Sequence, residues 1–382
     1  QCLVGSEMCI RDRASTPTTE IAVVAEKACG GLILTASHNP RQWNALKLLN
    51  EHGEFLSADE GGEVLRIAEQ RDYEFAPIDS LGHQYINNTY NRRHIDLVLA
   101  LDLVDVEAIR NADFTVTVDA VNSVGGIVIP ELLHALGVRN IIELNCAPTG
   151  RFAHLPEPIP ENLSAISDLT RESKADVGFV VDPDVDRLAI IMEDGRMFGE
   201  ENTLVSVADY VLTYKPGPVV NNLSSSRALR DIAEAHDCRY SSAAVGEVNV
   251  TTEMKRTGAV IGGEGNGGVI YPAIHYGRDA LVGVALFLTM LAKSGKKVSE
   301  LRASLPDYSI YKTKVELSEG LDVDAILATV KERFAGEQIT DIDGVKIDFK
   351  DSWVHLRKSN TEPIIRIYSE AHTMDELSLI HI

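Results

Sequence analysis

A short acidic segment enclosed by two apolar runs constrains this chain more than any other feature. Residues 177–181 (VGFVV) and 188–192 (LAIIM) are apolar throughout, which indicates two strands. Between them stand Asp182, Asp184 and Asp186. Carboxylates at alternate positions of an extended loop point to one side, so the segment predicts an all-oxygen site for a hard cation such as Mg²⁺.

Two other interpretations of the acidic segment were weighed. A calcium-binding helix-loop-helix is disfavoured because Arg187 stands where glycine is required and because residues 188–192 are strand-like. A purely structural acidic turn stays open. The metal site is therefore a prediction that needs support from other parts of the sequence.

The rest of the chain alternates short β-branched runs with amphipathic helical stretches. This pattern favours α/β units with mainly parallel strands. The expected strands are residues 31–36, 114–119, 141–144, 177–181, 188–192, 219–223 and 259–261, and the expected helices are residues 62–70, 130–136, 226–236 and 279–292. Beyond residue 308, strand-like residues 311–317, 345–349, 353–357 and 364–369 enclose one helix at 323–334, which indicates a smaller α+β domain.

The same alternation predicts four domains. We expect an incomplete first domain at residues 14–90, a second at 91–200, a third at 201–307 and the α+β domain at 308–376. Residues 1–13 (QCLVGSEMCIRDR) and 377–382 fit no element. They are expected to be foreign translated ends on a truncated reading frame, and they are left out of the prediction of the fold.

Composition argues against several classes of protein. The 382 residues carry a net charge of −21, which repels nucleic acid and anionic membranes, so an anionic ligand must be held by a few local cations. The apolar stretches are too short to cross a bilayer. The five cysteines form no C-x-x-C pair, which is typical of unpaired thiols in the cytoplasm. An ordinary cytoplasmic enzyme fits these figures.

A second polar segment, residues 35–40 (TASHNP), directly follows a predicted strand. A serine on a tight turn, with backbone N–H groups and a basic residue such as Lys47 nearby, can carry a phosphoryl group. Ser37 is therefore a candidate nucleophile. Taken alone, the segment is more often a polar turn at a strand end.

A third segment, residues 262–268 (GGEGNGG), follows another predicted strand. Glycines let the backbone approach a ligand, and Glu264 and Asn266 could bind vicinal sugar hydroxyls. The segment has neither a Walker lysine nor the spacing of a dinucleotide-binding loop. A flexible turn remains an equally good interpretation.

A fourth segment, residues 357–363 (RKSNTEP), is followed by Arg366 and Tyr368. Two arginines with hydroxyl and amide donors in one loop make a good receptor for a dianionic phosphate. A solvated charged turn is the alternative.

In this order, the four segments resemble the α-D-phosphohexomutases, a family that includes phosphoglucomutase, phosphomannomutase and phosphoglucosamine mutase. The resemblance spans residues 14–376 and places one segment in each domain. It implies three α/β domains and a smaller C-terminal domain around a central cleft. It also implies an isomerase that moves a phosphoryl group between the 1- and 6-positions of a hexose through a phosphoserine and a bisphosphate intermediate.

The resemblance implies roles for individual residues as well. Ser37 would be the phosphoserine, and its phosphate would join Asp182, Asp184 and Asp186 around Mg²⁺. Arg187 would brace the site, Lys47 would take part in proton transfer, and His38 would lie beside the phosphoserine. Glu264 and Asn266 would bind sugar hydroxyls. The phosphate that is not reacting would be held by Arg357, Ser359, Asn360, Thr361 and Arg366, and glucose or hexosamine 1,6-bisphosphate would act as activator.

The sequence departs from the family at a few positions. Ala45 stands where members usually have glycine, and Gly268 stands where many have histidine. His275 could compensate for the missing histidine, although a structural role is favoured. The proton-transfer assignment therefore rests on less than the metal site does.

Residues 43–47 (WNALK) and 262–268 most resemble the phosphoglucosamine mutase branch, so glucosamine 6-phosphate and 1-phosphate are the expected substrate pair. Glucose or mannose phosphate is the alternative. Two other classes stay open: a metal-dependent phosphohydrolase and a non-catalytic sugar-phosphate binding protein. The expected partner is a small sugar phosphate, with no nucleic acid or membrane, and the expected state is a monomer or homodimer.

Overall fold

The computed structural model describes residues 14–39, 43–83, 85–316, 322–358 and 364–380. The chain separates into two compact units. The first comprises residues 1–198 and 268–298, and the second comprises residues 199–267 and 299–382. The four expected domain boundaries stay predictions, as does the foreign end proposed at residues 1–13, which lies outside the described residues.

The first unit begins with a helix and a two-stranded sheet. Helix α2 (Thr16–Ala25) is capped by Ser15, and β1 (Gly31–Leu34) pairs antiparallel with β2 (Leu46–Leu49). Strand β2 was not expected from the sequence, and it is the element that carries Lys47. Helix α3 (Ala58–Gln70) starts four residues earlier than expected because Ser57 and Glu60 form a capping box.

The main sheet of the first unit places the acidic segment. Its strand order is β4-β3-β5-β6, formed by β4 (Asn140–Leu144), β3 (Thr115–Asp119), β5 (Val177–Val181) and β6 (Leu188–Met192). Strand β3 runs parallel to β4 and β5, whereas β5 and β6 are antiparallel. Every residue of β5 and β6 is buried. The two apolar runs are therefore strands, as expected, and the acidic segment is the turn between them.

Helices cover both faces of this sheet. Successive side chains of a strand point to opposite faces. Val180 packs in a cluster with Ile166 of α7 (Ser164–Ser173), and the neighbouring Phe179 meets Phe287 of α11 (Ala280–Ser294) edge to face. The remaining helices of the unit are α4 (Tyr90–Leu99), α5 (Val106–Ala112) and α6 (Gly125–Ala135). The result is the expected α/β/α layering around a mainly parallel sheet.

A buried polar network joins α2, α4 and the start of α11. Asp279 caps α11 by accepting from the N–H groups of Leu281 and Val282 at 2.8 and 3.4 Å. Its other oxygen lies 2.8 Å from Nε2 of His94 and 3.1 Å from Nε2 of His275. Glu20 of α2 lies 3.0 Å from Nδ1 of His275.

Both acidic partners act on His275. Burial acts to lower the pKa of His275, but the hydrogen bonds and charges of Asp279 and Glu20 outweigh it and raise the pKa to about 10. His275 is therefore a structural cation at neutral pH, which is the role that the sequence favours for it.

The second unit contains a three-stranded parallel arrangement. Strand β7 (Val219–Asn222) lies between β8 (Tyr240–Ala243) and β9 (Ile261–Glu264), and helices α8 (Glu200–Tyr214), α9 (Ala228–Ala235) and α10 (Glu247–Thr257) pack on these strands. The strand expected at residues 259–261 is placed too early. Strand β9 begins at Ile261, which pairs with Val219, and runs to Glu264, so residues 262–264 of the glycine-rich segment belong to a strand.

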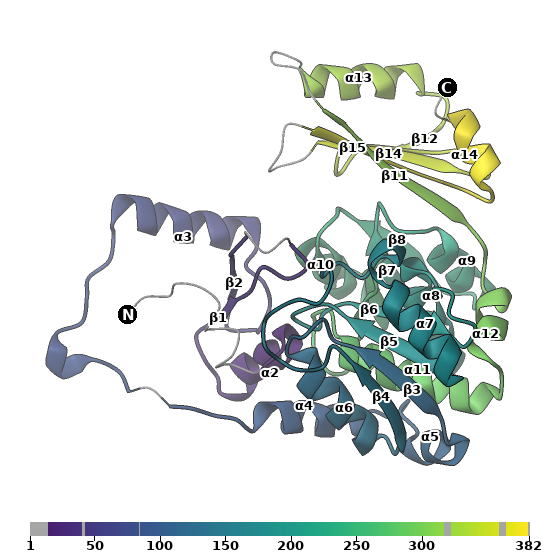
Figure 1. The fold of residues 1–382 in the computed structure, drawn as a ribbon. Helices are drawn as coiled ribbons and strands as arrows, with labels where there is room; N and C mark the ends of the chain where they lie inside the picture. Colours follow the sequence, from purple (N-terminus) through teal and green to yellow (C-terminus); the bar gives the residue numbers. More distant parts are fainter. Residues whose placement is uncertain (1–13, 40–42, 84, 317–321, 359–363, 381–382) are drawn as a thin grey trace. The chain divides into compact units, whose positions relative to one another are not determined.

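The C-terminal part of the second unit is an antiparallel sheet with α13 (Val323–Arg333) on one face (Figure 1). The strand order is β11-β15-β14-β13-β12, formed by β11 (Ser309–Glu316), β15 (Ile364–Ala371), β14 (Trp353–Lys358), β13 (Val345–Asp348) and β12 (Gln338–Thr340). Helix α14 (Met374–Ile380) packs through Leu377, whose side chain is only 1% exposed, and the foreign end expected at residues 377–382 stays a prediction. The expected fold class is confirmed, with three α/β portions and a smaller α+β domain.

Two observations bear on the environment of the chain. Among the described residues, no helix is both long enough and apolar enough to cross a membrane. Within the same residues, Cys29, Cys146 and Cys238 are unpaired thiols.

We expect Asp279→Ala to lower the free energy of unfolding of the first unit by about 3–5 kcal/mol, because it removes a helix cap, leaves the buried His94 without its carboxylate and leaves His275 with Glu20 alone. Urea unfolding followed by fluorescence measures the effect. Asp96→Ala is the matched control. Asp96 pairs with Arg92 on the exposed face of α4, so its loss should cost less than about 1 kcal/mol. Equal effects of the two substitutions would contradict the structural role given to Asp279.

Candidate active site

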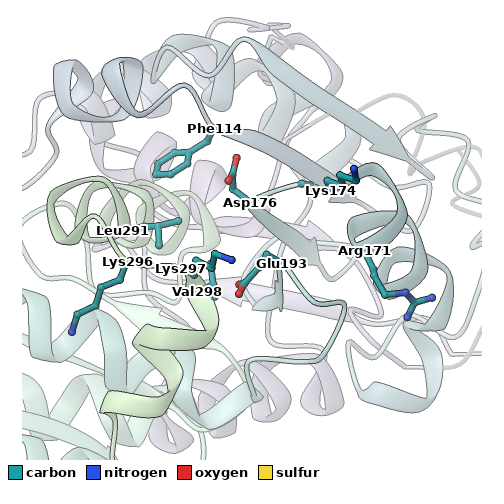
Figure 2. Close-up of a pocket in the computed structure, with 10 residues that line it drawn as sticks. Phe114, Arg171, Lys174, Asp176, Glu193, Leu291, Lys296, Lys297 and Val298 are labelled. Carbon is teal, nitrogen blue, oxygen red and sulfur yellow. The ribbon is translucent and has the colours of Figure 1, made fainter.

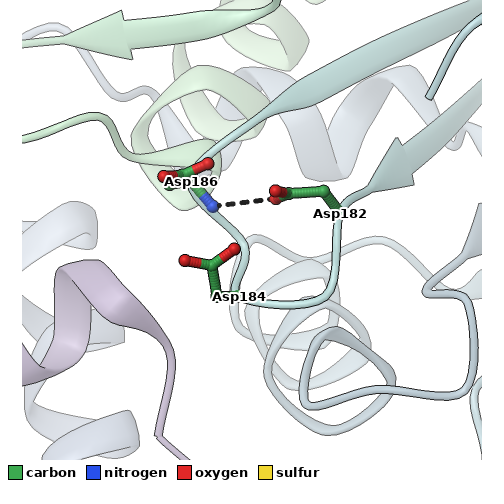
Figure 3. A group of neighbouring side chains, drawn as sticks. All are labelled: Asp182, Asp184 and Asp186. Carbon is green, nitrogen blue, oxygen red and sulfur yellow. Dashed lines mark hydrogen bonds between the residues drawn. The ribbon is translucent and has the colours of Figure 1, made fainter. Parts of the chain in front are cut away.

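The acidic turn between β5 and β6 is fixed by its own backbone. Asp182 accepts hydrogen bonds through one carboxylate oxygen from the N–H groups of Asp186 and Arg187 at 3.2 and 3.1 Å (Figure 3). The N–H of Val185 donates to the carbonyl of Asp182 at 3.1 Å. Val185 has a φ of 65°, which is rare for a β-branched residue, so the surrounding structure must hold the turn in this form.

Three hydrogen bonds from other parts of the first unit stabilise the turn in this conformation. The N–H of Thr16 donates to the carbonyl of Asp184 at 3.0 Å, and the N–H of Ala280 donates to the carbonyl of Val185 at 3.2 Å. The hydroxyl of Ser123 donates to the carbonyl of Pro183 at 2.6 Å. The starts of α2 and α11 therefore position the turn.

The three aspartates can hold a metal ion. Asp182, Asp184 and Asp186 are 0%, 4% and 0% exposed, and one carboxylate oxygen from each lies within 4.8 Å of those of the other two. Oδ1 of Asp184 and Oδ1 of Asp186 are buried, and none of the described residues donates a hydrogen bond to them. Buried carboxylate oxygens without a donor suit a hard divalent cation such as Mg²⁺.

Three cations of the protein surround the turn. Nζ of Lys47 lies 2.6 Å from Oδ2 of Asp184 and 3.2 Å from Oδ2 of Asp186. A terminal nitrogen of Arg278 lies 2.6 Å from Oδ2 of Asp186, and Nε of Arg187 lies 3.9 Å from its Oδ1. Lys47 and Arg187 were expected here. Arg278, just before α11, was missed because nothing local marks it.

Burial and charge shift the pKa values at this turn in opposite directions. Burial raises the pKa of Asp182 well above its usual range, and the charges of Asp186 and Asp184 add to the shift. Burial also acts to raise the pKa of Asp186, but Arg278, Lys47 and Arg187 outweigh it and hold the pKa below its usual value. For Lys47, burial acts to lower the pKa, and the two carboxylates outweigh it and raise the pKa. Lys47 is therefore protonated in this arrangement.

Ser37 lies against the acidic turn. Its hydroxyl donates to Oδ2 of Asp182 at 3.0 Å, and its N–H donates to the hydroxyl of Thr35 at 3.0 Å. Ser37 has a φ of 48°, so it sits on the tight turn that the sequence predicted. His38 brings Nδ1 to 3.4 Å from the Ser37 hydroxyl, and burial together with Arg187 lowers its pKa to about 4, so the ring is neutral at physiological pH.

In the second unit, the residues of the glycine-rich segment converge on one carboxylate. Glu264 is the last residue of β9 and is 5% exposed. Its Oε1 accepts from the Asn222 amide at 2.8 Å and from the N–H of Gly246 at 3.2 Å. The Asn266 amide lies 3.5 Å from Oε2. The two candidates, Glu264 and Asn266, therefore lie side by side.

Glu201, in the first turn of α8, lies beneath this segment and was missed from the sequence. Its Oε2 accepts from the N–H of Ser226 at 2.9 Å. A Cβ added to Gly265 would come within 1.9 Å of the same oxygen, so any larger residue there would displace the Glu201 carboxylate from its hydrogen bond. Burial and the neighbouring Glu200 raise the pKa of Glu201 to about 8, although Lys312 acts in the opposite direction.

The candidate phosphate loop is described in part. Ser359, Asn360 and Thr361 lie outside the described residues. Arg357 of β14 and Arg366 of β15 are direct cross-strand partners, and Arg366 is opposite Lys314 of β11 on its other side. Directly opposite side chains share a face of the sheet, and like charges there are destabilising. A bound anion would offset the repulsion in this row of three cations. Lys314 was missed because strand register is not visible in the sequence.

The expected site residues thus gather in two groups, one in each unit. In the first unit lie Ser37, His38, Lys47, Asp182, Asp184, Asp186 and Arg187. In the second unit lie Glu264, Asn266, Arg357 and Arg366.

The first unit also has a separate pocket of about 280 Å³ (Figure 2). Among the described residues, none of the expected site residues lines it. Its lining includes Phe114, Arg171, Lys174, Glu193, Lys296 and Lys297.

Comparison with known families covers most of the chain. Residues 4–74, 92–195 and 200–308 match alpha/beta/alpha domains I, II and III of phosphoglucomutase/phosphomannomutase. Residues 313–380 match the C-terminal domain of the same family.

Individual relatives agree with this result. The chain is 37% identical over 375 residues to a phosphoglucomutase/phosphomannomutase of Thermococcus kodakarensis, covering 95% of this chain and 79% of that protein. It is 32% identical over 361 residues to a probable phosphoglucosamine mutase of Methanopyrus kandleri, covering 94% and 78%. Among solved structures, a phosphoglucomutase/phosphomannomutase family protein of Burkholderia thailandensis superposes with a TM-score of 0.82 at 25% identity, covering 96% and 79%.

We expect Gly265→Ala to lower the free energy of unfolding of the second unit by about 1–3 kcal/mol, because the added methyl group collides with the Glu201 carboxylate. Thermal unfolding measures the change. Adding Glu201→Ala removes the colliding group, so the double variant should recover part of the loss. Gly336→Ala is the control, since a Cβ there meets nothing within 4 Å. A Gly265→Ala protein as stable as this control would contradict the close packing.

Proposed function

Because the chain belongs to the phosphoglucomutase/phosphomannomutase family and is a phosphohexomutase, we propose that Ser37 is its phosphoryl carrier and that glucosamine phosphate is its substrate. The observation that carries the proposal is the contact between the Ser37 hydroxyl and Asp182 at 3.0 Å. It sets a nucleophile on a tight turn against three buried carboxylates, two of which keep an oxygen without a donor among the described residues.

The proposed step at Ser37 replaces one bond to phosphorus by another. The bond between the serine oxygen and phosphorus breaks, and the serine oxygen leaves with the electron pair. A hexose hydroxyl oxygen forms the new bond to phosphorus, and its proton passes to a neighbouring side chain. The bisphosphate then returns its other phosphoryl group to Ser37 by the same changes in reverse. Hexose 1-phosphate and 6-phosphate are interconverted in this way.

Magnesium would be held by Asp182, Asp184, Asp186 and a phosphate oxygen on Ser37, and it would supply positive charge beside the oxygens of the transferring group. The chain's own groups support the same step. Lys47 and Arg187 place fixed positive charge at the turn. The neutral ring of His38, 3.4 Å from the serine oxygen, can accept a proton.

The second unit would bind the substrate. Glu264 and Asn266 would bind sugar hydroxyls, and Arg357 and Arg366, with Ser359, Asn360 and Thr361, would hold the phosphate that is not reacting. The cross-strand row of Arg357, Arg366 and Lys314 supports this assignment, since three neighbouring cations favour a dianion. Either phosphate of the bisphosphate presents the same chemistry to such a site.

The substrate proposal rests on two lines of support. The resemblance at residues 43–47 and 262–268 favours an amino sugar, and the Methanopyrus kandleri relative is named a probable phosphoglucosamine mutase. Glucose or mannose phosphate is the alternative, in keeping with the name of the Thermococcus kodakarensis relative. A glucose or hexosamine 1,6-bisphosphate activator, a cytoplasmic location and a monomer or homodimer belong to the same proposal.

A non-catalytic sugar-phosphate binding protein would need neither a nucleophile nor a metal. Ser37 and all three aspartates are present and in contact, which favours catalysis over binding alone. A phosphohydrolase is disfavoured as well, because the family models and the relatives that the chain matches are named as mutases.

We expect the chain to gain one phosphoryl group when it is incubated with glucose 1,6-bisphosphate and Mg²⁺, since a serine held against a metal site can be phosphorylated. Intact-mass spectrometry measures the gain. Ser37→Ala should show none, and the exposed helix cap Ser57→Ala should behave as the unaltered chain. Chelation of the metal should abolish the gain. A phosphorylated Ser37→Ala protein would remove Ser37 as the carrier.

We expect the rate on glucosamine 1-phosphate to exceed the rates on glucose and mannose 1-phosphate by about tenfold or more, because one hydrogen bond at the 2-position distinguishes these sugars. Steady-state kinetics on the three sugars measures kcat/KM for each. Equal values, or a preference for glucose or mannose, would overturn the choice of an amino sugar and leave the mutase activity itself intact.

A further inference from the structure

One carboxylate ties the candidate phosphate loop to the turn before α10. Oδ2 of Asp343, in the segment between β12 and β13, accepts from the N–H of Val245 at 3.0 Å. The same oxygen lies 3.3 Å from Nε of Arg357. The contact is made at Nε, and a guanidinium also has two terminal nitrogens of the kind that bind oxyanions.

A first route, meaning an unbroken series of hydrogen bonds and covalent bonds, leads from Asp343 to Glu264 through two adjacent backbone N–H groups. Gly246 follows Val245, and its N–H donates to Oε1 of Glu264 at 3.2 Å. Gly246 has a φ of 116°, a conformation that residues with a side chain rarely adopt. The N–H groups of Val245 and Gly246 thus bind the carboxylates of Asp343 and Glu264. Asp343 belongs to the candidate phosphate site, and Glu264 belongs to the candidate sugar site.

A second route begins at the backbone of Asp343. Nε2 of His355 lies 2.7 Å from the Asp343 carbonyl, which can only accept, so Nε2 carries the proton. Burial lowers the pKa of His355 to about 4, so the ring is neutral and its Nδ1 accepts from the Ser224 hydroxyl at 2.9 Å.

This second route ends on the same oxygen as the first. The N–H of Ser224 donates to Oδ1 of Asn222 at 2.9 Å, and the Asn222 amide donates to Oε1 of Glu264 at 2.8 Å. The hydroxyl of Ser225 also donates to Oδ1 of Asn222, at 3.0 Å, which fixes the orientation of the amide. Two hydrogen-bonded routes therefore converge on Oε1 of Glu264.

We propose that Asp343 is a positioning residue that couples phosphate binding at Arg357 to sugar recognition at Glu264. The proposal rests on the roles given to Arg357 and Glu264 in the proposed function. A phosphate that attracts Arg357 weakens the ion pair between Arg357 and Asp343. The Val245–Gly246 turn, which donates to both Asp343 and Glu264, transmits this change to Glu264. Coupling of this kind is reciprocal, so sugar binding also favours phosphate binding.

Exposure differs along the two routes in a way that suits this role. Asp343 and Arg357 keep 24% and 21% of their side-chain surface exposed, so the ion pair can be reached by a ligand. His355 is only 1% exposed, and Ser224 is 9% exposed. The second route behind the ion pair is therefore buried, whereas Val245 and Gly246 of the first route are half-buried.

The test is a double-mutant cycle on binding of glucosamine 6-phosphate, measured by isothermal titration calorimetry. The full chain carries Ser37→Ala, so no turnover contributes. Asp343→Asn keeps an acceptor for Val245 but loses the charge, and Glu264→Gln alters the other end. We expect each substitution to weaken binding by about tenfold, and the two together to weaken it by clearly less than the product of the single effects.

Asp341→Asn is the matched control. Asp341 lies two residues away in the same segment and pairs with Lys331 on an exposed surface, so its loss should leave affinity unchanged. Ser224→Ala breaks the second route with little change in volume, and it should also be non-additive with Glu264→Gln. The Ser224→Ala variant allows the coupling to be tested even if the Asp343→Asn protein does not fold.

Each outcome decides the proposal. If the fold-losses of affinity caused by Asp343→Asn and Glu264→Gln multiply in the double variant, Asp343 acts on Arg357 alone and the coupling is overturned. If the Ser37→Ala chain does not bind glucosamine 6-phosphate, both the coupling and the proposed binding site are overturned. Turnover of the unaltered chain is measured separately. A chain without turnover whose cycle is non-additive would lose the proposed function and keep the coupling.

Discussion

Burial of three carboxylates on one turn is the constraint on which the first unit depends. Each buried charge costs several kcal/mol unless cations and hydrogen bonds compensate it. Lys47, Arg187 and Arg278 supply that compensation, and they come from β2, from the turn itself and from the start of α11. Elements far apart in the chain are therefore drawn to one point by charge, and two carboxylate oxygens still keep no donor among the described residues.

Backbone hydrogen bonds also stabilise the acidic turn. The turn adopts a rare conformation at Val185 because α2 and α11 each direct an N–H group at its carbonyls. The network of His94, Asp279 and His275 then fixes α2, α4 and α11 to one another. The geometry of the acidic turn and the stability of the first unit thus rest on the same helix starts.

Local patterns made part of this structure predictable. The two apolar runs, the acidic turn and Ser37 are each marked within a few neighbouring residues, and all three lie as the sequence indicates. Arg278 could not be found in this way, since 92 positions separate it from Asp186. The positions of Glu201 and Lys314 depend on packing and strand register, and the start of β9 depends on the pairing of Ile261 with Val219. None of these three leaves a local signal.

The first unit is discontinuous, because residues 199–267 belong to the second unit and the chain then returns with residues 268–298. This order matters while the chain is being synthesised from its N-terminus. A nascent chain that ends before residue 268 already contains Glu20, His94 and Asp186 but still lacks His275, Arg278 and Asp279. Its acidic turn lacks Arg278 and its histidine network lacks His275 and Asp279 until α11 has left the ribosome, so native packing of the first unit waits for synthesis of part of the second.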